Sequence, residues 1–458
     1  MMPSCRFPSA NSTALGACRS RMEGGAAMKL ELTNEMRAAM PLIEKLETEG
    51  HEAVFVGGAV RDAVLGLPVH DIDIATSALP EQVMALFPKC IPTGLQHGTV
   101  TVVHEGLTYE VTTYRTESGY EQFRKPSSVA FVQSLDEDLL RRDFTMNAMA
   151  IRQSGSVYDP YDGLADIGQS RLRCVGNAGD RLQEDALRML RAVRFLGAYG
   201  LRPVPSLWRG LRMNKALLRH IAMERVQAEL DKMLSSDTPE RALAWLGASG
   251  LWADFKEPVP SRLMMRIQAS AGGEGFEMAE LGRLKHLDER WAAALLSLQA
   301  GEGDARELLI RLKLPNKRIG LIVTMLQLHA EIAPLVKTGD MEGLRAAWLE
   351  GILRFGEEAA GHWIHVAQIL ESHADPLPPA VAHRLSLLMK EMPVKSLKQL
   401  AISGNDLQQA LSRKAGPWMS AMLKRLLYAA AAGEVANEQD KLIELSILWN
   451  EEGTYHES

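Results

Sequence analysis

The sequence predicts an α+β fold, in which a mixed sheet with helices at the N-terminal end is followed by an all-α remainder. Two observations support this division. Up to about residue 175, short runs with the alternation of strands lie between helical patterns. From Asp180 to the C-terminus almost no strand pattern remains, and helical blocks punctuated by Gly, Pro and Asn follow one another. The 458 residues are enough for about three domains with cores of their own.

The first elements can be placed from turn signals. A helical pattern ends at Gly50, an apolar strand follows over residues 53–56, and a second helix closes at Gly66. The run DIDIAT, which starts at Asp71, then alternates as a strand should, and a helix begins near Pro80.

The rest of the head contains two strands, a polar segment and a charged triplet. The two strand patterns, GTVTVVHEG and LTYEVTTY, are separated by a Glu-Gly turn. Residues 113–140, which are rich in Gly, Pro and Ser at their centre, predict a flexible surface loop. Arg141-Arg142-Asp143 precedes the run FTMNAMAI, which predicts a helix with Asp143 as its N-terminal cap.

Composition excludes several classes of protein. The chain is 46% hydrophobic and 24% charged, which is typical of a soluble globular protein. No segment approaches ~18 consecutive apolar residues, so we expect no membrane span. The four cysteines form no CxxC pair, which argues against a disulfide framework and a zinc site and favours a reducing cytoplasm.

The distribution of charge permits a nucleic acid as partner. The formal net charge of −6 would by itself count against one, because binding phosphates requires clustered Lys and Arg. Residues 171–225, however, contain 12 Lys and Arg against 4 Asp and Glu. This basic stretch is the kind of surface that RNA binding needs.

Candidate metal ligands lie on the DIDIAT strand. Asp71 and Asp73 flank Ile72, so we expect both carboxylates on the same face, where they can bind Mg²⁺ together with substrate phosphates. Glu110, on a later strand, is a third carboxylate that could face the same ions. Most isolated DxD pairs are solvated surface residues, and only the surroundings favour a metal site here.

Phosphate-binding features precede this pair of aspartates. Gly57 and Gly58 lie at a junction from strand to helix, where backbone N–H groups can approach a triphosphate. Arg61 can supply a cation to the same phosphates, whereas Asp62 fits an ion-pair role. The sequence lacks both GK[ST] and GxGxxG after the strand, so it contains neither a P-loop nor a dinucleotide fingerprint.

These motifs resemble those of a known family. GG, twelve intervening residues, DxD and a later acidic residue resemble the polymerase-beta-like nucleotidyltransferases. More narrowly, VGGAVRDAVLG, DIDIATSALPEQV, RRDFTMNAMA and EDALRMLRAVRF resemble successive motifs of class II tRNA nucleotidyltransferases, the bacterial CCA-adding enzymes and their poly(A) polymerase relatives. KLPNKRI, ISGNDL and AGPWM are similar to the Bacillus-type branch.

The helix pattern EDALRMLRAVRF offers a way to read a base. Asp185 and Arg188 are three residues apart, and with Arg191 and Arg194 they are expected to share one helix face. A carboxylate can accept from the exocyclic amino group of cytosine or adenine while a guanidinium donates to the ring nitrogen, and uracil and guanine reverse this polarity. A solvated cationic face is the plainer interpretation of such a run.

The resemblance assigns roles to these residues. It implies that Asp185 and Arg188 read the base, that Arg142 and Asp143 bind the nucleotide, and that residues 113–140 form the flexible loop that helps the site change from C to A addition. We expect Glu184 to orient Arg188, and Arg191 and Arg194 to reach phosphates or brace the site.

The resemblance also implies a division of the chain. We expect a disordered extension over residues 1–27, with Met28 as a plausible true start, and a catalytic nucleotidyltransferase head over 28–175. A helical neck over 176–235 would read the base, followed by a helical body over 236–375 and a tRNA-binding tail over 376–458. The implied activity is template-independent addition and repair of the 3′-terminal CCA of tRNA from CTP and ATP, with Mg²⁺ as cofactor, in the cytoplasm; the family also includes homodimers.

Other functions stay open at this point. The residues do not separate full CCA addition from A addition alone or from poly(A) synthesis. A non-catalytic RNA-binding protein would not be expected to keep every motif. A hydrolase of the HD type would need His-Asp ligands in the helical part, and His362 and His365 have no Asp after them, so they fit satisfied or exposed helix histidines better.

Overall fold

The computed structural model describes residues 28–121, 125–272, 280–370 and 377–452. The predicted extension over residues 1–27 lies outside these ranges. The chain forms two compact units, one up to Phe276 and one from Glu277 onward, and each is described by itself.

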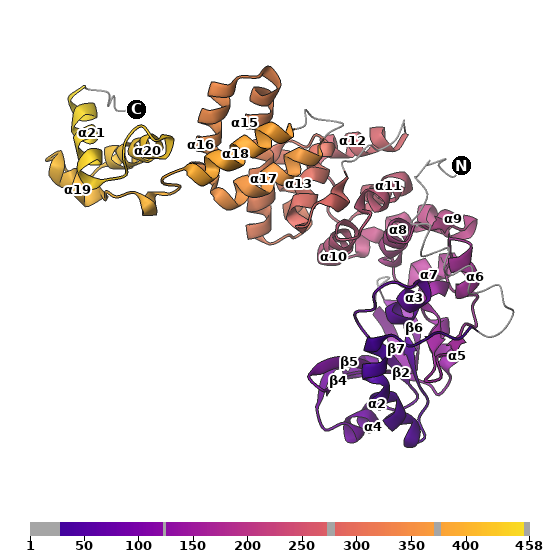
Figure 1. Cartoon of the computed structure of the whole chain (residues 1–458). Helices are drawn as coiled ribbons and strands as arrows, with labels where there is room; N and C mark the ends of the chain where they lie inside the picture. The colour runs from indigo at the N-terminus through magenta and orange to yellow at the C-terminus, as the bar shows by residue number, and fades with distance from the viewer. Residues whose placement is uncertain (1–27, 122–124, 273–279, 371–376, 453–458) are drawn as a thin grey trace. The chain divides into compact units, whose positions relative to one another are not determined.

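The first unit begins with a seven-stranded mixed sheet in the order β3-β4-β5-β2-β1-β8-β9. Figure 1 labels β2, β4 and β5 of this sheet. β2 and β5 are parallel, and the other neighbouring pairs are antiparallel. The strands are β1 (Ala53–Val56), β2 (Asp73–Thr76), β3 (Cys90–Gly94), β4 (Thr99–His104), β5 (Leu107–Thr113), β8 (Ala150–Ile151) and β9 (Val157–Tyr158). The helices of this part are α2 (Asn34–Thr48), α3 (Gly58–Leu65), α4 (Pro80–Leu86), α5 (Leu135–Leu140) and α6 (Gly163–Gly168). The predicted mixed head is confirmed.

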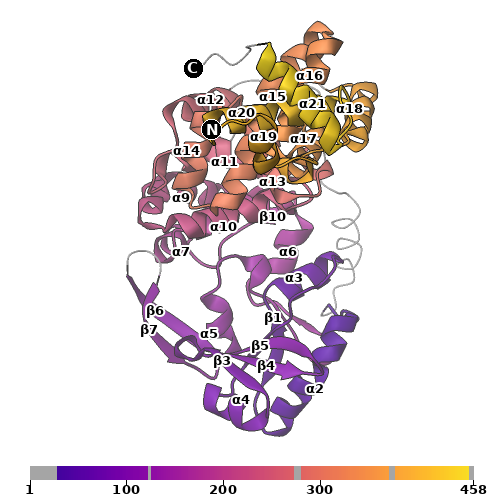
Figure 2. The same cartoon turned by 90° about the vertical axis from the view of Figure 1, so that its left-hand side faces the viewer.

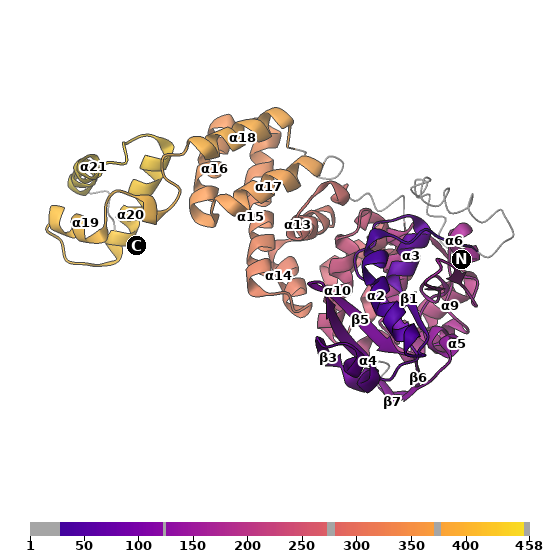
Figure 3. The same cartoon turned by 60° about the horizontal axis from the view of Figure 1, so that its bottom comes forward.

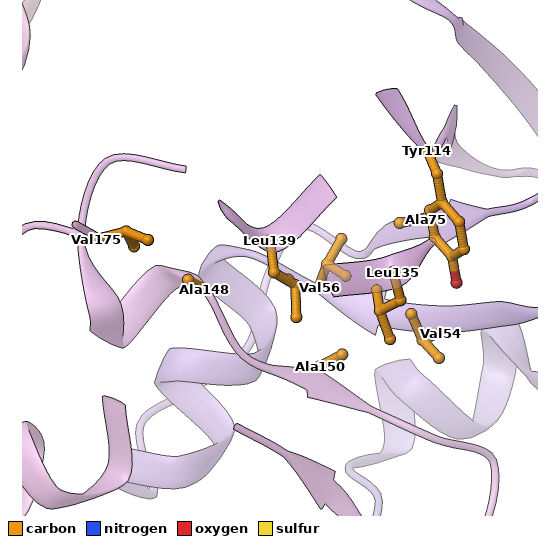
Figure 4. Close-up of a cluster of buried hydrophobic side chains, with 9 residues drawn as sticks. All are labelled: Val54, Val56, Ala75, Tyr114, Leu135, Leu139, Ala148, Ala150 and Val175. Carbon is orange, nitrogen blue, oxygen red and sulfur yellow. The ribbon is translucent and has the colours of Figure 1, made fainter. Parts of the chain in front are cut away.

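A cluster of buried side chains joins one face of the sheet to α5. Leu135 and Leu139 of α5 point toward Val54 and Val56 of β1 (Figure 4). Side chains directly opposite one another in a sheet share a face. Val56 pairs with Asp73 and Asp73 pairs with Glu110, so both acidic side chains lie on the face that carries this cluster.

The polar segment after β5 forms regular secondary structure in its described residues, so the expectation of an irregular loop is wrong there. It forms an antiparallel hairpin of β6 (Arg115–Glu121) and β7 (Lys125–Phe131), separate from the large sheet (Figure 2). Polar residues are paired across the hairpin: Ser118 with Ser128, whose hydroxyls are 2.6 Å apart, and, in the backbone register, Glu121 with Lys125. Such cross-strand pairs stabilise a sheet even where the composition is polar.

The helix predicted after Arg141-Arg142-Asp143 is also absent. A single short 3₁₀ turn (Thr145–Asn147) leads directly into β8. The apolar run FTMNAMAI is buried on all sides, as in a central strand, so its hydrophobicity has no helical period.

Six helices complete the first unit: α7 (Ala178–Glu184), α8 (Arg188–Ala198), α9 (Pro205–Asn214), α10 (Met223–Leu234), α11 (Pro239–Ser249) and α12 (Ser261–Gly272). A two-residue parallel pair, β10 (Arg171–Leu172) with β11 (Arg202–Pro203), lies among them. α8 packs against α11, where Gly197 brings the two backbones together. A Cβ on Gly197 would lie 2.5 Å from backbone atoms of Ala242.

The second unit is helical throughout its described residues, as predicted. Its helices are α13 (Leu287–Ser297), α14 (Glu302–Arg311), α15 (Asn316–Thr338), α16 (Met341–Phe355), α17 (Glu357–Ile369), α18 (Pro379–Glu391), α19 (Gly404–Ala410), α20 (Pro417–Ala432) and α21 (Gln439–Glu451). The last three, α19 to α21, pack against one another (Figure 3).

Helix α15 is the one described helix that is long and apolar enough, by length and composition, to cross a membrane. It packs against α13, α14, α16 and α17. Its buried side chains include Ile322, Val323 and Leu326. This packing is that of a core helix and accounts for its apolar composition.

The close contact at Gly197 gives a test of the packing between α8 and α11. We expect Gly197→Ala to lower the free energy of unfolding by about 1–3 kcal/mol, because the new methyl group has no space against Ala242. Chemical denaturation of the full chain measures this change. Gly320→Ala is the matched control, since nothing lies within 4 Å of a Cβ there, and it should stabilise the chain by about 0.4–1 kcal/mol. Equal effects of the two substitutions would contradict the packing.

Candidate active site

A polar cavity of about 480 Å³ lies in the first unit. It is lined by seven arginines, three aspartates and five other residues: Arg61, Arg141, Arg142, Arg188, Arg191, Arg194, Arg225, Asp73, Asp143, Asp185, Gly57, Gly58, Asn147, Leu187 and Phe195. The excess of arginine favours an anionic ligand such as a triphosphate. All the predicted site residues line this cavity except Asp71 and Glu110, which are exposed.

The junction of β1 and α3 forms one wall. Gly57 has a φ of 72°, and a Cβ at this residue would lie 3.1 Å from Oδ2 of Asp73 and 3.4 Å from Nη1 of Arg142. Only glycine therefore fits here, because another residue would be strained at this positive φ and its Cβ would crowd Asp73 and Arg142. The backbone at the start of α3 thus lies beside a carboxylate and a guanidinium.

Three carboxylates gather where β2 begins beside the middle of β5. Asp73 is the first residue of β2, and Asp71 lies just before the strand, with buried Ile72 between them. Burial raises the pKa of Asp73 to about 6, and the charges of Glu110 and Asp71 contribute in the same direction while Arg142 opposes them. The carboxylates therefore repel one another, and a bound divalent cation would relieve this repulsion.

The donor set fits a hard cation. Carboxylate oxygens are the ligands that Mg²⁺ prefers, usually with substrate phosphates completing the coordination. Asp71 and Asp73 could hold the ion directly, and Glu110 lies beside Asp73 in the strand register.

The predicted triplet Arg141-Arg142-Asp143 is held by buried carboxylates. Asp138, which is fully buried on α5, accepts from Arg141 at 2.7 Å and from Arg142 at 3.2 Å. Nε of Arg142 is buried and has no hydrogen-bond partner among the described residues. The atom of Arg142 that lies beside Gly57 is Nη1, at the cavity wall.

Asp143 is paired within the chain, so its predicted role as a helix cap is wrong. Its Oδ1 accepts from the backbone N–H of Phe144 and from Asn147, at 2.8 and 2.9 Å. Its Oδ2 accepts from Nε and Nη2 of Arg191 at 2.8 and 2.6 Å. Burial opposes the charge, but Arg191 and Asn147 hold the pKa of Asp143 at about 2. These four donors fill its usual acceptor sites and make it a brace for Arg191.

The expectation of one continuous helix face for Asp185 and Arg188 is also wrong. α7 ends at Glu184, Asp185 has an extended backbone, and α8 begins at Arg188. Asp185 accepts from the backbone N–H of Leu187 at 3.0 Å and from Nη2 of Arg225 at 2.8 Å. The break turns Asp185 toward the cavity independently of the helical period.

Arg188 is oriented by Glu184, as predicted. Its Nη1 donates to Oε2 of Glu184 at 2.5 Å, and Nη2 donates to the backbone carbonyl of Arg141 at 3.1 Å. The side chain is largely buried, so its position is fixed from both the neck helices and the head.

Arg61 and Arg194 are braced by acids and aromatic rings. Arg61 pairs with Asp62 at 2.9 Å, as expected for Asp62, and its guanidinium lies 4.8 Å from the ring centre of Tyr199. Arg194 pairs with Glu229 at 2.8 Å and lies 4.2 Å from the ring centre of Phe195. Both guanidinium groups still line the cavity.

Sequence reasoning missed several residues of this site. Arg225 lies 40 residues from its partner Asp185 and only the high charge of residues 171–225 pointed to it. Asp138, Asn147 and Glu229 act by holding arginines, a role that no local motif announces. Arg141 was part of the triplet but had no role of its own.

The raised pKa of Asp73 predicts a pH effect on stability in the absence of divalent cations. A carboxyl whose pKa is higher in the folded state than in the unfolded state binds more protons when folded, so stability falls as pH rises from about 4 to 6 and then stays low. Solvent at the partly exposed side chain limits this cost to about 1–2 kcal/mol.

In EDTA, Asp73→Asn should therefore stabilise the chain more at pH 7.5 than at pH 4.5. Unfolding in denaturant at the two pH values measures the difference, and Glu81→Gln, at an exposed residue of α4, is the control. An Asp73→Asn effect that is independent of pH would contradict the burial and repulsion described above.

Comparisons with known proteins agree with this geometry. Residues 53–173 match the poly A polymerase head domain, 200–258 the probable RNA and SrmB-binding site of polymerase A, and 283–445 the putative tRNA nucleotidyltransferase domain 2. The chain is 39% identical over 405 residues to the CCA-adding enzyme of Geobacillus stearothermophilus, covering 88% of this chain and 95% of that one. It is 37% identical over 423 residues to the CCA-adding enzyme of Bacillus cereus strain Q1, covering 88% and 96%.

Solved structures give the same result. The crystal structure of the Bacillus stearothermophilus CCA-adding enzyme in complex with CTP is similar with a TM-score of 0.80 and 36% identity, over 92% of this chain and 98% of that one. The Thermotoga maritima CCA-adding enzyme complexed with tRNA shares the fold, with a TM-score of 0.60 at 17% identity, over 96% and 99%. The resemblance seen in the sequence motifs is thus confirmed over most of the chain, and the chain belongs to the CCA-adding enzymes, a family of tRNA nucleotidyltransferases.

Proposed function

We propose that this chain adds and repairs the 3′-terminal CCA of tRNA, using CTP and ATP and releasing pyrophosphate. The observation that carries the proposal is the placement of Asp73 and Glu110 on one sheet face, directly beside a cavity lined by seven arginines. Metal-binding carboxylates next to a phosphate-binding cavity are what nucleotidyl transfer to an RNA hydroxyl requires. The family and its CTP-bound relative support the same reaction.

In this proposal the head holds the reacting groups. Asp71 and Asp73 would hold Mg²⁺, with Glu110 as a helper, and a bound ion would supply Lewis-acid activation of the tRNA 3′ hydroxyl and charge stabilisation of the leaving pyrophosphate. Arg142 and the backbone at Gly57 and Gly58 hold the triphosphate. The close approach of Nη1 of Arg142 to Gly57, and the place of all three residues on the cavity wall, support these roles.

The break between α7 and α8 reads the base. Oδ2 of Asp185 is bound by Arg225, yet each carboxylate oxygen has a second lone pair for the amino group of cytosine or adenine. Arg188 donates to the neighbouring ring nitrogen. Arg191, braced by Asp143, and Arg194, braced by Glu229, add positive charge around the phosphates.

The tRNA and the cellular location follow from the same family. We propose that the helices after the neck recognise the shape of the tRNA and contact its phosphate groups, because the base edges of double-stranded RNA are not accessible. We further propose that the chain acts in the cytoplasm, where tRNA and both nucleotides are present. A homodimer remains a prediction that sedimentation would test.

Loss of the metal ligands should abolish the chemistry and spare tRNA binding. We expect Asp71→Ala and Asp73→Ala each to lower incorporation of labelled CTP by at least about a thousandfold, because several kcal/mol of charge stabilisation are lost. Filter binding of tRNA should change little. Glu81→Ala, an exposed acid on α4, is the control and should keep full activity. Unchanged turnover of the aspartate variants would overturn the metal assignment.

Loss of Asp185 should lower both rate and selectivity. Removing a hydrogen bond to the amino group costs about 1–3 kcal/mol, so Asp185→Ala should reduce kcat/KM for CTP and ATP roughly 10–100-fold. UTP has a carbonyl in place of the amino group, so its kcat/KM should fall less. The ratio of kcat/KM for CTP to kcat/KM for UTP should therefore become smaller. Glu224→Ala, at an exposed acid beside Arg225, is the control. An unchanged ratio would show that Asp185 does not read the base.

tRNAs that end at different points of the 3′ terminus distinguish full CCA addition from A addition alone and from poly(A) synthesis. Single-nucleotide incorporation on tRNAs that end at the discriminator base, after C and after CC should give C, C and A in turn. Addition of A alone to the last substrate would indicate an A-adding enzyme, and long A tails would indicate a poly(A) polymerase.

A further inference from the structure

Three histidines surround a buried glutamate in the second unit, far along the chain from the nucleotide site. Glu289 lies in the first turn of α13 and is 1% exposed. His286 directly precedes that helix, while His362 and His365 lie one turn apart on α17. α13 and α17 are in contact (Figure 1), so the cluster joins two helices that are about 70 residues apart in sequence.

The side chains converge on one point. Nδ1 of His362 and Nδ1 of His365 each lie 2.8 Å from Oε1 of Glu289. The rings of His286 and His362 meet edge to face, with centres 4.8 Å apart. One ligand atom each from His286, Glu289 and His362 lies within 4.8 Å of the others.

These distances are close to those of a metal site. Bonds of 2.0–2.2 Å to a tetrahedral ion place neighbouring ligand atoms roughly 3.4 Å apart. The hydrogen-bonded distance of 2.8 Å between His362 and Glu289 would therefore open by only about 0.6 Å. Small rotations of the two side chains are enough for this change.

The charge of Glu289 points the same way. Glu289 is 1% exposed; its Oε1 is hydrogen-bonded to Nδ1 of His362 and of His365, and its Oε2 accepts from the backbone N–H of His286. A carboxylate buried in this way needs a compensating positive charge. A cation can enter from the surface, since His286 is exposed.

We propose that His286, Glu289 and His362 form a binding site for a transition-metal cation of the zinc class. Imidazole nitrogens with one carboxylate oxygen are a ligand set that suits such ions, whereas Mg²⁺ and Ca²⁺ prefer oxygen alone. His365 contacts the same carboxylate oxygen at the surface, where its side chain is 59% exposed, and would act as an outer partner of Glu289. The ion would cross-link α13 and α17 and stabilise the helical unit by linkage to folding.

The test uses the full chain stripped of metal with a chelator. Zn²⁺ is titrated by calorimetry with millimolar Mg²⁺ present, so that the carboxylates of the head are already occupied by the ion they prefer. We expect one Zn²⁺ per chain and a rise in Tm when it binds. Co²⁺ titrated into the unaltered chain should give visible absorption bands of a low-symmetry site with nitrogen ligands.

Substitutions of the histidines test whether the ion binds at this cluster. His286→Gln and His362→Gln should each weaken Zn²⁺ binding by more than the roughly 10–100-fold that loss of an outer partner costs. His383→Gln, at an exposed histidine of α18, is the matched control and should bind as before. No saturable Zn²⁺ binding by the unaltered chain, or binding that both site variants retain, would overturn the proposal and leave a hydrogen-bonded cluster only.

If either glutamine variant fails to fold, the Co²⁺ bands of the unaltered chain still decide. A spectrum of hydrated Co²⁺ alone would rule the site out. Incorporation of CTP plays no part in these measurements, so their outcome is independent of the proposed activity.

Discussion

The ion pair between Asp143 and Arg191 is the interaction on which the nucleotide cavity depends. Seven arginines around one cavity repel one another, and they can stay there only if buried carboxylates hold them. Asp143 lies on the segment that follows α5, and Arg191 lies on α8, so the pair joins the sheet-bearing head to the neck helices. Breaking it by removing Arg191 would leave the buried carboxylate of Asp143 without its charge partner, which costs more than the pair itself contributes.

The same arrangement recurs around the cavity wall. Asp138 holds Arg141 and Arg142, Glu229 holds Arg194, and Glu184 holds Arg188. Each acid neutralises part of a guanidinium and fixes its direction, so that the arginines lining the cavity are ordered before a ligand binds. A site prepared in this way binds an anion with a small cost of side-chain reorganisation.

The sequence predicted the parts of this structure that local patterns determine. The turn at Gly57, the helix end at Gly66 and the strand with Asp73 follow from backbone geometry and alternation, and all are present. The neck helix was predicted as continuous because 3.6-residue spacing cannot reveal the break at Asp185. The hairpin of β6 and β7 was predicted as a loop because its sequence is rich in polar residues and its pairing is between strands, which a local pattern does not show. Partners such as Arg225 and Glu229 depend on tertiary packing, which a single sequence does not encode locally.

The buried and half-buried carboxylates of the chain differ in which groups compensate their charge. This difference distinguishes carboxylates with a structural role from those that can bind a cation. Asp143 has an arginine and two further donors, and its pKa lies at about 2. Asp73 has Arg142 nearby but also two like charges, and its pKa rises to about 6. The hydrogen-bonding capacity of Asp143 is filled by the chain itself, so its role is to hold Arg191 in place. The charge of Asp73 is not balanced by the chain, so the free energy of folding contains a cost that an external cation removes when it binds. The same reasoning applies to Glu289, where histidines supply hydrogen bonds but a full positive charge must come from a proton or a metal.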